Sequence, residues 1–168
     1  PILRAVAEDS ARTGRVIHIH ASETAREVEE CVGAHGMSPV AYLDSLGVLG
    51  PRTVLAHAVH LSDEDIDIIR ERKSWISHCP CSNFKLASGQ FRYHKAVELG
   101  GCRFTLGTDG CASNNNLSML EEMKFAALSA KNESGEPTAG RDGDILHAAT
   151  RAGAEAFGID AGLIEEGK

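Results

Sequence analysis

Four short apolar runs, each followed by a helical pattern, constrain the fold of this chain more than any other feature. The runs are rich in apolar and β-branched residues and are predicted to be strands. They are Arg15–His20, Thr53–Ala58, Trp75–His78 and Cys102–Leu106. Strands that alternate with helices form parallel sheets joined by right-handed crossovers. The sequence therefore predicts an α/β fold.

Apolar residues at helical spacing, bounded by capping residues and glycines, predict the helices. Gly14 and Gly36 are placed to end two of them, and Ser62 opens a capping-box pattern. The predicted helices are Pro1–Thr13, Thr24–Ala34, Val40–Leu46, Asp63–Lys73, Phe91–Leu99, Leu117–Lys131, Asp144–Thr150 and Ala152–Phe157. Cys79–Asn83 and Asn132–Gly143 hold turn-forming residues, and we expect both to be loops.

Polar residues gather where the predicted strands end. His20, Glu23, His57, His78 and Asp109 all lie at or just past a strand's carboxyl end. Four β-α units could form half of an eight-stranded barrel or a small doubly wound sheet. The clustering favours the barrel, because barrel enzymes carry their active sites at this end.

Asp109 follows the last apolar run and lies between Gly107 and Gly110. Glycines at this place let a ligand approach the backbone closely. A carboxylate here can bind a metal ion, and it can also accept a proton from water that the metal has acidified. We interpret Asp109 as the central functional residue of the chain.

The other candidates each keep a structural alternative. His18 and His20 project to the same face of a strand, and the terminal position favours His20 as a metal ligand. Glu23 could favour a helix amino terminus through its charge, or act as a proton shuttle or substrate anchor. His57 ends an apolar strand, where a purely structural role is the alternative.

Charge and composition exclude several classes of protein. The net charge is −7 and aromatic residues make up only 5%, so we expect no nucleic-acid binding. No apolar run is long enough to span a membrane. The five scattered cysteines fit a reducing cytoplasm, and we interpret the Cys79-x-Cys81 pair as ordinary thiols. The chain opens on Pro1 within a helical pattern, so we expect a fragment truncated at both ends.

Four motifs in order along the chain resemble the amidohydrolase superfamily. Within its deaminase and chlorohydrolase branch, the sequence is most similar to 5-methylthioadenosine/S-adenosylhomocysteine deaminases and the related 5′-deoxyadenosine deaminases. The most specific part of this resemblance runs from Asn114-Asn115-Asn116-Leu117 to Glu121-Glu122-Met123-Lys124. The four motifs are Val16–Thr24, Ala56–Leu61, His78–Gly89 and Gly107–Leu117.

The resemblance implies a metal-dependent hydrolase with a (β/α)₈ TIM barrel, of which residues 1–168 cover about strands five to eight. It implies one divalent metal, usually Zn²⁺ with Fe²⁺ as the alternative, held by His20 and Asp109. It also implies that Glu23 contacts the purine and shuttles protons, that His57 polarises the attacked centre or steadies the water, and that Asp109 is the base. The reaction would replace an adenine amino group by hydrolysis and release ammonia from a small-molecule nucleoside.

The chain departs from the family where the first barrel strand should stand. The H-x-H pair of that strand and the terminal β-sandwich are absent from the sequence. Zinc sites usually need three protein ligands, so we expect the isolated chain to bind metal weakly and to be inactive. We expect association with the missing half-barrel or homo-oligomers. The alternatives are a guanine, 8-oxoguanine or cytosine deaminase, a triazine chlorohydrolase, or a fragment without catalysis.

Overall fold

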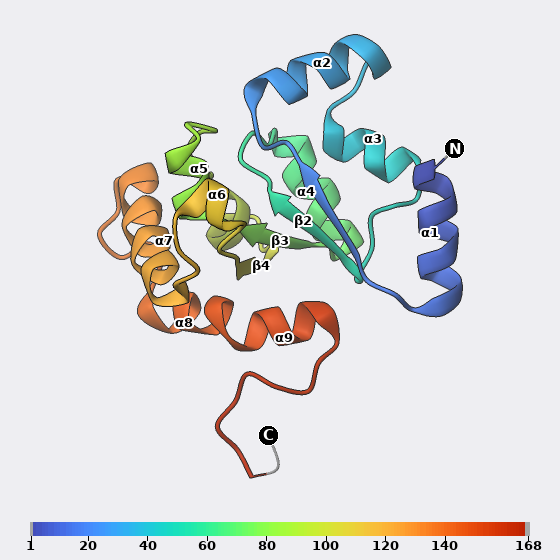
Figure 1. Cartoon of the computed structure of the whole chain (residues 1–168). Helices are drawn as coiled ribbons and strands as arrows, with labels where there is room; N and C mark the ends of the chain where they lie inside the picture. Colours follow the sequence, from blue (N-terminus) through green and yellow to red (C-terminus); the bar gives the residue numbers. More distant parts are fainter. Residues whose placement is uncertain (1, 167–168) are drawn as a thin grey trace.

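The computed structural model describes residues 2–166 and places four parallel strands at the centre of the chain (Figure 1). The strands follow one another in the sheet in the order β1-β2-β3-β4. Their bounds are β1 (Ile17–Ala21), β2 (Thr53–His57), β3 (Trp75–His78) and β4 (Arg103–Leu106). A doubly wound sheet reverses its strand order at a switch point, and these four strands do not. The predicted α/β class and parallel sheet are confirmed.

The helices connect the strands and follow the last one. They are α1 (Ile2–Thr13), α2 (Ala25–His35), α3 (Pro39–Ser45), α4 (Asp63–Arg72), α5 (Pro80–Lys85), the π-helix η1 (His94–Leu99), α6 (Cys111–Asn114), α7 (Met119–Ser134), α8 (Asp142–Ala149) and α9 (Arg151–Phe157). Among residues 2–166, no helix combines the length and the apolar character that a membrane crossing requires.

Local capping explains where several helices begin and end. The Thr24 side chain accepts a hydrogen bond from the Glu27 backbone N–H at the start of α2. That helix ends at Gly36, whose φ of 72° is left-handed and costs glycine little. Ser62 and Asp65 complete a reciprocal capping box at the start of α4. These boundaries agree with the sequence-based ones to within about two residues.

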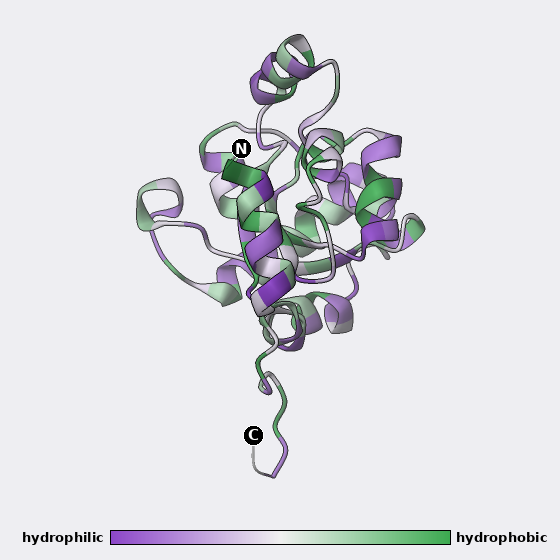
Figure 2. Cartoon of the chain, turned by 90° about the vertical axis from the view of Figure 1, so that its right-hand side faces the viewer, coloured by the Kyte–Doolittle hydropathy of each residue, from purple (hydrophilic) through white to green (hydrophobic). Residues whose placement is uncertain are grey.

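The main hydrophobic core covers one face of the sheet. The register aligns Leu55 with Ile76 and Ile76 with Phe104, so the three side chains share that face. Ile66 and Ile69 of α4 belong to the same core cluster. Burying a side chain of this size stabilises the fold by about 1.5–3 kcal/mol. Apolar residues concentrate towards the interior in Figure 2, while the surface helix near the amino terminus mixes both characters.

The opposite face is covered at the amino ends of the strands. Val54 and Trp75 pair in the register and form a second cluster with Ala152 and Ala156 of α9. In Figure 1, α8 and α9 lie on the same side of the sheet. The carboxyl end of this face, where β1 carries His20, is not part of the second cluster. The functional side chains therefore lie beyond the α9 contact.

Two stretches that we predicted to be loops contain helix instead. Pro80 occupies the first turn of α5, where its fixed φ suits a helix and its missing N–H costs nothing. Between Asp109 and Leu117, where we had predicted no helix, the chain also forms the four-residue helix α6. The predicted loop from Asn132 begins too early, because α7 continues to Ser134 and ends at the left-handed Gly135. Turn-forming residues were present at each site, but they cap helices.

The assignment of the core predicts that two Leu→Ala variants differ strongly in their free energy of unfolding. Leu55→Ala removes a fully buried side chain and should lower the free energy of unfolding by about 2–5 kcal/mol. Leu120→Ala removes a side chain that is 79% exposed on α7 and should change it by less than about 0.5 kcal/mol. Urea denaturation of both variants checks this, and equal losses would contradict the assignment.

Candidate functional site

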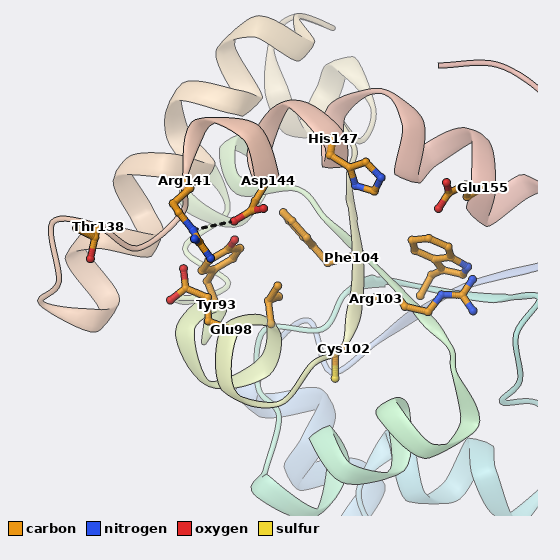
Figure 3. A pocket seen from close by; sticks show the side chains of 12 residues that line it. Tyr93, Glu98, Cys102, Arg103, Phe104, Thr138, Arg141, Asp144, His147 and Glu155 are labelled. Atoms are coloured by element: carbon orange, nitrogen blue, oxygen red, sulfur yellow. Dashed lines mark ion pairs between the residues drawn. The ribbon is translucent and has the colours of Figure 1, made fainter. Parts of the chain in front are cut away.

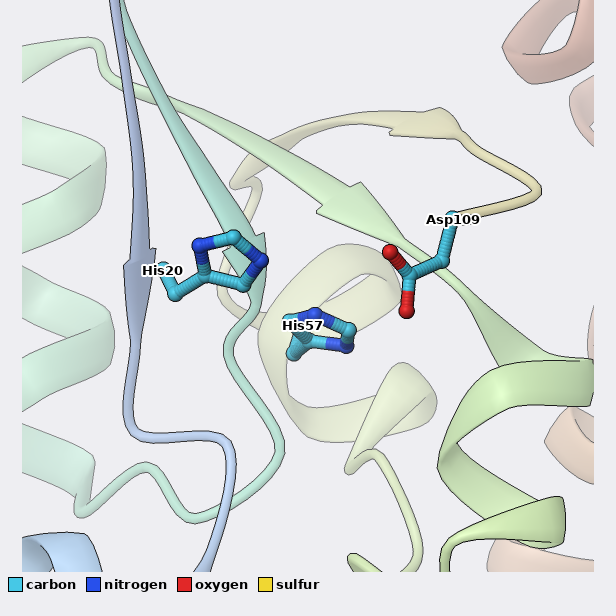
Figure 4. Close-up of side chains that lie close together, drawn as sticks. All are labelled: His20, His57 and Asp109. Carbon is cyan, nitrogen blue, oxygen red and sulfur yellow. The ribbon is translucent and has the colours of Figure 1, made fainter. Parts of the chain in front are cut away.

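Three of the sequence-predicted residues converge at the carboxyl edge of the sheet. His20 comes from β1, His57 ends β2, and Asp109 follows β4 (Figure 4). One ligand-capable atom from each of the three lies within 4.8 Å of the others. Because parallel strands end at a common edge, residues far apart in the sequence meet there. We name His20, His57 and Asp109 the ligand triad.

His57 reaches the triad because its backbone leaves the strand conformation. His20 is in register with Ala56, so strict alternation would direct His57 to the opposite face. His57 instead has a φ of 67°, and Ala58 follows with 49°. The His57 ring stacks on that of His20 with centroids 5.1 Å apart and an interplanar angle of 22°. Non-glycine residues with left-handed φ carry strain of order 1–3 kcal/mol, and such strain gathers at functional sites.

A buried hydrogen-bond chain sets the protonation of His57. Its Nδ1 lies 2.8 Å from Oδ1 of Asn83, which can only accept, so Nδ1 carries the proton and Nε2 keeps a lone pair. The Asn83 amide nitrogen lies 3.4 Å from Nδ1 of His78, which fixes the amide orientation. Burial lowers the pKa of His78 to about 3, with a smaller electrostatic contribution from His57, and keeps that ring neutral.

Asp109 is held as a carboxylate by hydroxyl donors. Ser82 Oγ and Ser113 Oγ lie 2.7 and 2.6 Å from its Oδ2. Burial disfavours ionisation, but the hydrogen bonds from Ser113, Ser82 and the Gly110 backbone outweigh it and lower the pKa of Asp109. The backbone of Asp109 is left-handed, with a φ of 57°. Both hydroxyl donors bind one oxygen, and the carboxylate faces the two imidazoles.

Glu23 lies beside the triad. Its Oε2 is 3.9 Å from Nε2 of His57, and its Oε1 accepts a hydrogen bond from Ser88 Oγ at 3.2 Å. The structural alternative for Glu23 was a helix amino-terminal acid. Glu27 fills that place, because its carboxylate accepts the backbone N–H groups of Ser22 and Glu23, each at 2.8 Å. The Glu23 carboxylate therefore faces His57.

His18 occupies a neighbouring position without joining the triad. It lines a cavity of about 200 Å³ together with all three triad residues. Its ring meets that of Phe157 edge-on at 5.9 Å. Burial lowers the pKa of His18, with smaller electrostatic contributions from His20 and then His57. Of the two histidines on β1, the structure brings His20 into the triad.

The donor set of the triad fits a divalent transition metal. Two imidazole nitrogens and one carboxylate oxygen are the ligand types of catalytic zinc sites, which leave further positions open for water or substrate. The mutual spacing of at most 4.8 Å allows one ion to be reached by all three residues. The sequence had paired only His20 and Asp109 as ligands, and in the structure a ring nitrogen of His57 lies within the same distance of both.

Sequence reasoning missed four polar residues that support these side chains. They come from loops and short helices whose sequence signal is weak: Ser82, Asn83, Ser88 and Ser113. Three of the four lie in the His78–Gly89 motif, to which we had assigned no role. In the same motif, burial raises the thiol pKa values of Cys79 and Cys81 to about 12, which disfavours the thiolate form of both.

A larger cavity lies at the other end of the sheet. It has a volume of about 680 Å³ and opens near the start of β3 and β4, where Trp75 and Arg103 line it (Figure 3). The Arg103 guanidinium sits 3.9 Å above the Trp75 ring. The cavity contains no triad residue and mixes acidic with basic side chains. Its size alone therefore does not make it the functional site.

Comparison with known proteins identifies relatives over the whole chain. Residues 2–168 match the model of the amidohydrolase family. A 5′-deoxyadenosine deaminase of Methanothermobacter thermautotrophicus is 50% identical over 99% of this chain. A 5-methylthioadenosine/S-adenosylhomocysteine deaminase of Archaeoglobus fulgidus is 44% identical over 98%. A zinc-bound adenosine deaminase from Xanthomonas campestris superposes with a TM-score of 0.93 and 38% identity, covering 99% of this chain and 38% of its own.

The match covers only part of each relative. The chain spans 39% of the length of both curated relatives named above. An atrazine chlorohydrolase from Arthrobacter aurescens, complexed with zinc, also superposes with a TM-score of 0.90 at 26% identity. This chain corresponds to 37% of that structure. Deaminases and a chlorohydrolase therefore share the arrangement of these strands and helices.

The hydrogen bond between Asn83 and His57 predicts a measurable change in the imidazole. Asn83→Ala leaves a buried Nδ1–H without an acceptor and should cost about 1–3 kcal/mol of stability. The ¹⁵N chemical shifts of His57 should change from one tautomer to a mixture. Asn116→Ala is the control, because its amide bonds to Glu121 at an exposed position. An unchanged His57 tautomer in Asn83→Ala would contradict the assigned role.

Proposed function

Because this chain belongs to the amidohydrolase family, we propose that it forms strands five to eight of a (β/α)₈ barrel in a metal-dependent deaminase. The substrate is an adenosine-like nucleoside such as 5′-deoxyadenosine, 5-methylthioadenosine or S-adenosylhomocysteine. Hydrolysis replaces the amino group of the purine and releases ammonia. Residues of the same protein outside this chain, or of a second chain, complete the barrel and the metal site.

The convergence of His20, His57 and Asp109 with Glu23 carries this proposal. Side chains of the types that bind metals lie within a few ångströms of one another and of the Glu23 carboxylate. They do so at the edge of the sheet where barrel enzymes carry their active sites. The two curated relatives named above are both deaminases of adenine nucleosides, at 50% and 44% identity. That level of identity supports the same substrate class for this protein. The strand order without reversal supports a barrel wall.

We assign His20 and Asp109 as the metal ligands, with Zn²⁺ as the ion and Fe²⁺ as the alternative. A bound divalent cation of this kind lowers the pKa of water to about 7 and so supplies hydroxide near neutral pH. Asp109 is kept ionised by Ser82 and Ser113, as both a ligand and a base require. The zinc-bound relatives support the choice of zinc.

His57 and Glu23 are assigned to the substrate side of the site. Nδ1 of His57 is committed to Asn83, so only Nε2 can face the reacting groups. Glu23 Oε2 lies 3.9 Å from that nitrogen, which places an acid and a neutral imidazole side by side. Glu23 can hold a proton for a ring nitrogen of the purine. His57 can steady the attacking water. We assign Glu23, His57 and Asp109 together as the residues that bind the substrate.

Two further features bear on the location and the partners of the protein. The five cysteines are free thiols, which fits the reducing cytoplasm. In this chain β1 and β4 are the outer strands of the sheet. Unpaired edges of parallel strands favour pairing with further strands. We therefore propose association with the other half of the barrel, and homo-oligomers of the assembled protein.

Replacing each triad residue in turn should distinguish the metal ligands, His20 and Asp109, from His57, which is proposed to steady the water. His20→Ala and Asp109→Asn should weaken zinc binding by more than about 100-fold, beyond the 10–100-fold typical of residues that only support ligands. His57→Ala should retain most zinc affinity and lose activity. Competition with a chromophoric chelator measures the affinity in the complete protein. His35→Ala, on α2, is the control. Equal losses for His57→Ala and His20→Ala would make His57 a ligand.

The proton-shuttle role of Glu23 predicts a catalytic defect without a metal defect. Glu23→Gln keeps the size of the side chain and removes its ability to carry a proton, so kcat should fall by about 10²–10⁴-fold. Zinc affinity should stay unchanged. Glu29→Gln, at an exposed position on α2, is the matched control. Ammonia release from 5′-deoxyadenosine measures the rate, and a Glu23→Gln enzyme with full activity would exclude the role.

A substrate panel tests the proposed function as a whole. The complete protein should release ammonia from 5′-deoxyadenosine, 5-methylthioadenosine and S-adenosylhomocysteine far faster than from guanine, 8-oxoguanine or cytosine. It should not release chloride from a chlorotriazine. Preference for guanine or the triazine would reassign it to another branch of the family. No turnover of any of them by the metal-loaded protein would favour a non-catalytic role.

A further inference from the structure

Glu122 is a buried carboxylate without a part in the proposed reaction. It lies on α7 with 0% exposure, and the triad does not include it. Burying a carboxylate is costly unless its oxygens accept hydrogen bonds. Both oxygens of Glu122 do so, and each bond leads towards Asp109 by a separate route.

The first route passes through Asn114 of α6. The Asn114 amide nitrogen donates to Glu122 Oε1 at 2.5 Å and to the Thr108 carbonyl oxygen at 2.6 Å. Both partners can only accept, so the amide nitrogen must be the atom between them. Thr108 directly precedes Asp109 in the chain. Glu122 thus fixes Asn114, and Asn114 fixes the peptide that joins Thr108 to Asp109.

The second route passes through the first turn of α5. The Cys81 backbone N–H donates to Glu122 Oε2 at 3.1 Å. The next residue is Ser82, whose hydroxyl donates to Asp109 Oδ2 at 2.7 Å. A carboxylate at the start of this helix holds the turn that presents Ser82. Glu122 therefore supports both the backbone and the side chain of Asp109.

From these contacts we infer that Glu122 is a positioning residue for Asp109, and the inference rests on the metal-ligand role proposed for Asp109. Asp109 needs such support because its φ of 57° is left-handed, a conformation that a non-glycine residue keeps only when its surroundings impose it. Glu122 does not touch the triad itself. It acts through Asn114 and through the turn at Cys81.

The network requires a carboxylate and rejects the isosteric amide. Glu122→Gln would bring an NH₂ group against either the Cys81 N–H or the Asn114 amide nitrogen. In the first case two donors face each other, and the α5 contact is lost. In the second case Asn114 would have to flip, and its oxygen would then face the Thr108 carbonyl oxygen. One route to Asp109 is broken in each arrangement, while the volume of the side chain is unchanged.

A role in packing alone would look different from a role in positioning. Glu122 also ties α5 and α6 to α7, so its loss could destabilise the fold without any effect on Asp109. A double-mutant cycle separates the two. If Glu122 acts through Asp109, its removal should have no further effect on metal affinity once Asp109 is already Asn.

The experiment measures Zn²⁺ affinity by chelator competition in the complete protein carrying E122Q, D109N or both. E122Q should weaken zinc binding by about 10–100-fold, the range typical of residues that orient ligands. The double variant should bind zinc as D109N does. D65N is the matched control, because Asp65 is buried and bonded to Ser62 and Ser38 but shares no hydrogen-bond partner with Asp109. It should lower the melting temperature and leave zinc affinity unchanged.

Each result decides between the roles. Losses of affinity that multiply in the double variant, or an E122Q affinity equal to wild type, would overturn the positioning role. A D109N protein that binds zinc normally would overturn the proposed metal site itself, and this inference with it. If E122Q does not fold, N114A breaks only the Thr108 route. Its zinc affinity should fall in the native Asp109 background and stay unchanged in D109N, and a full wild-type affinity would contradict the inference.

Discussion

The common direction and register of four parallel strands is the constraint on which the rest of this structure depends. Leu55, Ile76 and Phe104 stand side by side because neighbouring strands pair in register, and the helices bury that row. The same register brings the carboxyl ends of the strands to one edge. His20 and Asp109 are 89 residues apart in numbering, yet their ligand atoms lie within 4.8 Å. Hydrophobic pairing on one face thus assembles a polar site.

The site is held by a polar network that the core alone could not provide. His57 and Asp109 both have left-handed backbones, which cost free energy and need support from their surroundings. Asn83 gives that support to His57, and the two serines with Glu122 behind them give it to Asp109. Most of these partners come from the short helices α5 and α6. These helices supply the hydrogen bonds that keep the metal-binding groups in place.

Membership of the amidohydrolase family and the geometry of the site support each other. The family match extends over residues 2–168, the triad provides donor types found at catalytic zinc sites, and a similar solved structure contains bound zinc. The chain covers 39% of the curated deaminases it matches. Under the proposed function, this chain would provide the base, the two ligands and the proton shuttle, and groups outside it would complete the site.

The α/β class and the four strands could be predicted from the sequence, because apolar periodicity and helix capping depend on a few neighbouring residues. The sequence also singled out His20, Glu23, His57 and Asp109. Three features became visible only in the folded chain: His57 turns towards His20, the Glu27 carboxylate accepts the backbone N–H groups of Ser22 and Glu23 ahead of α2, and α5 and α6 are helices. Local patterns do not encode a left-handed residue or a partner 26 positions away, such as Asn83 for His57. Those choices depend on contacts that exist only after the strands have paired.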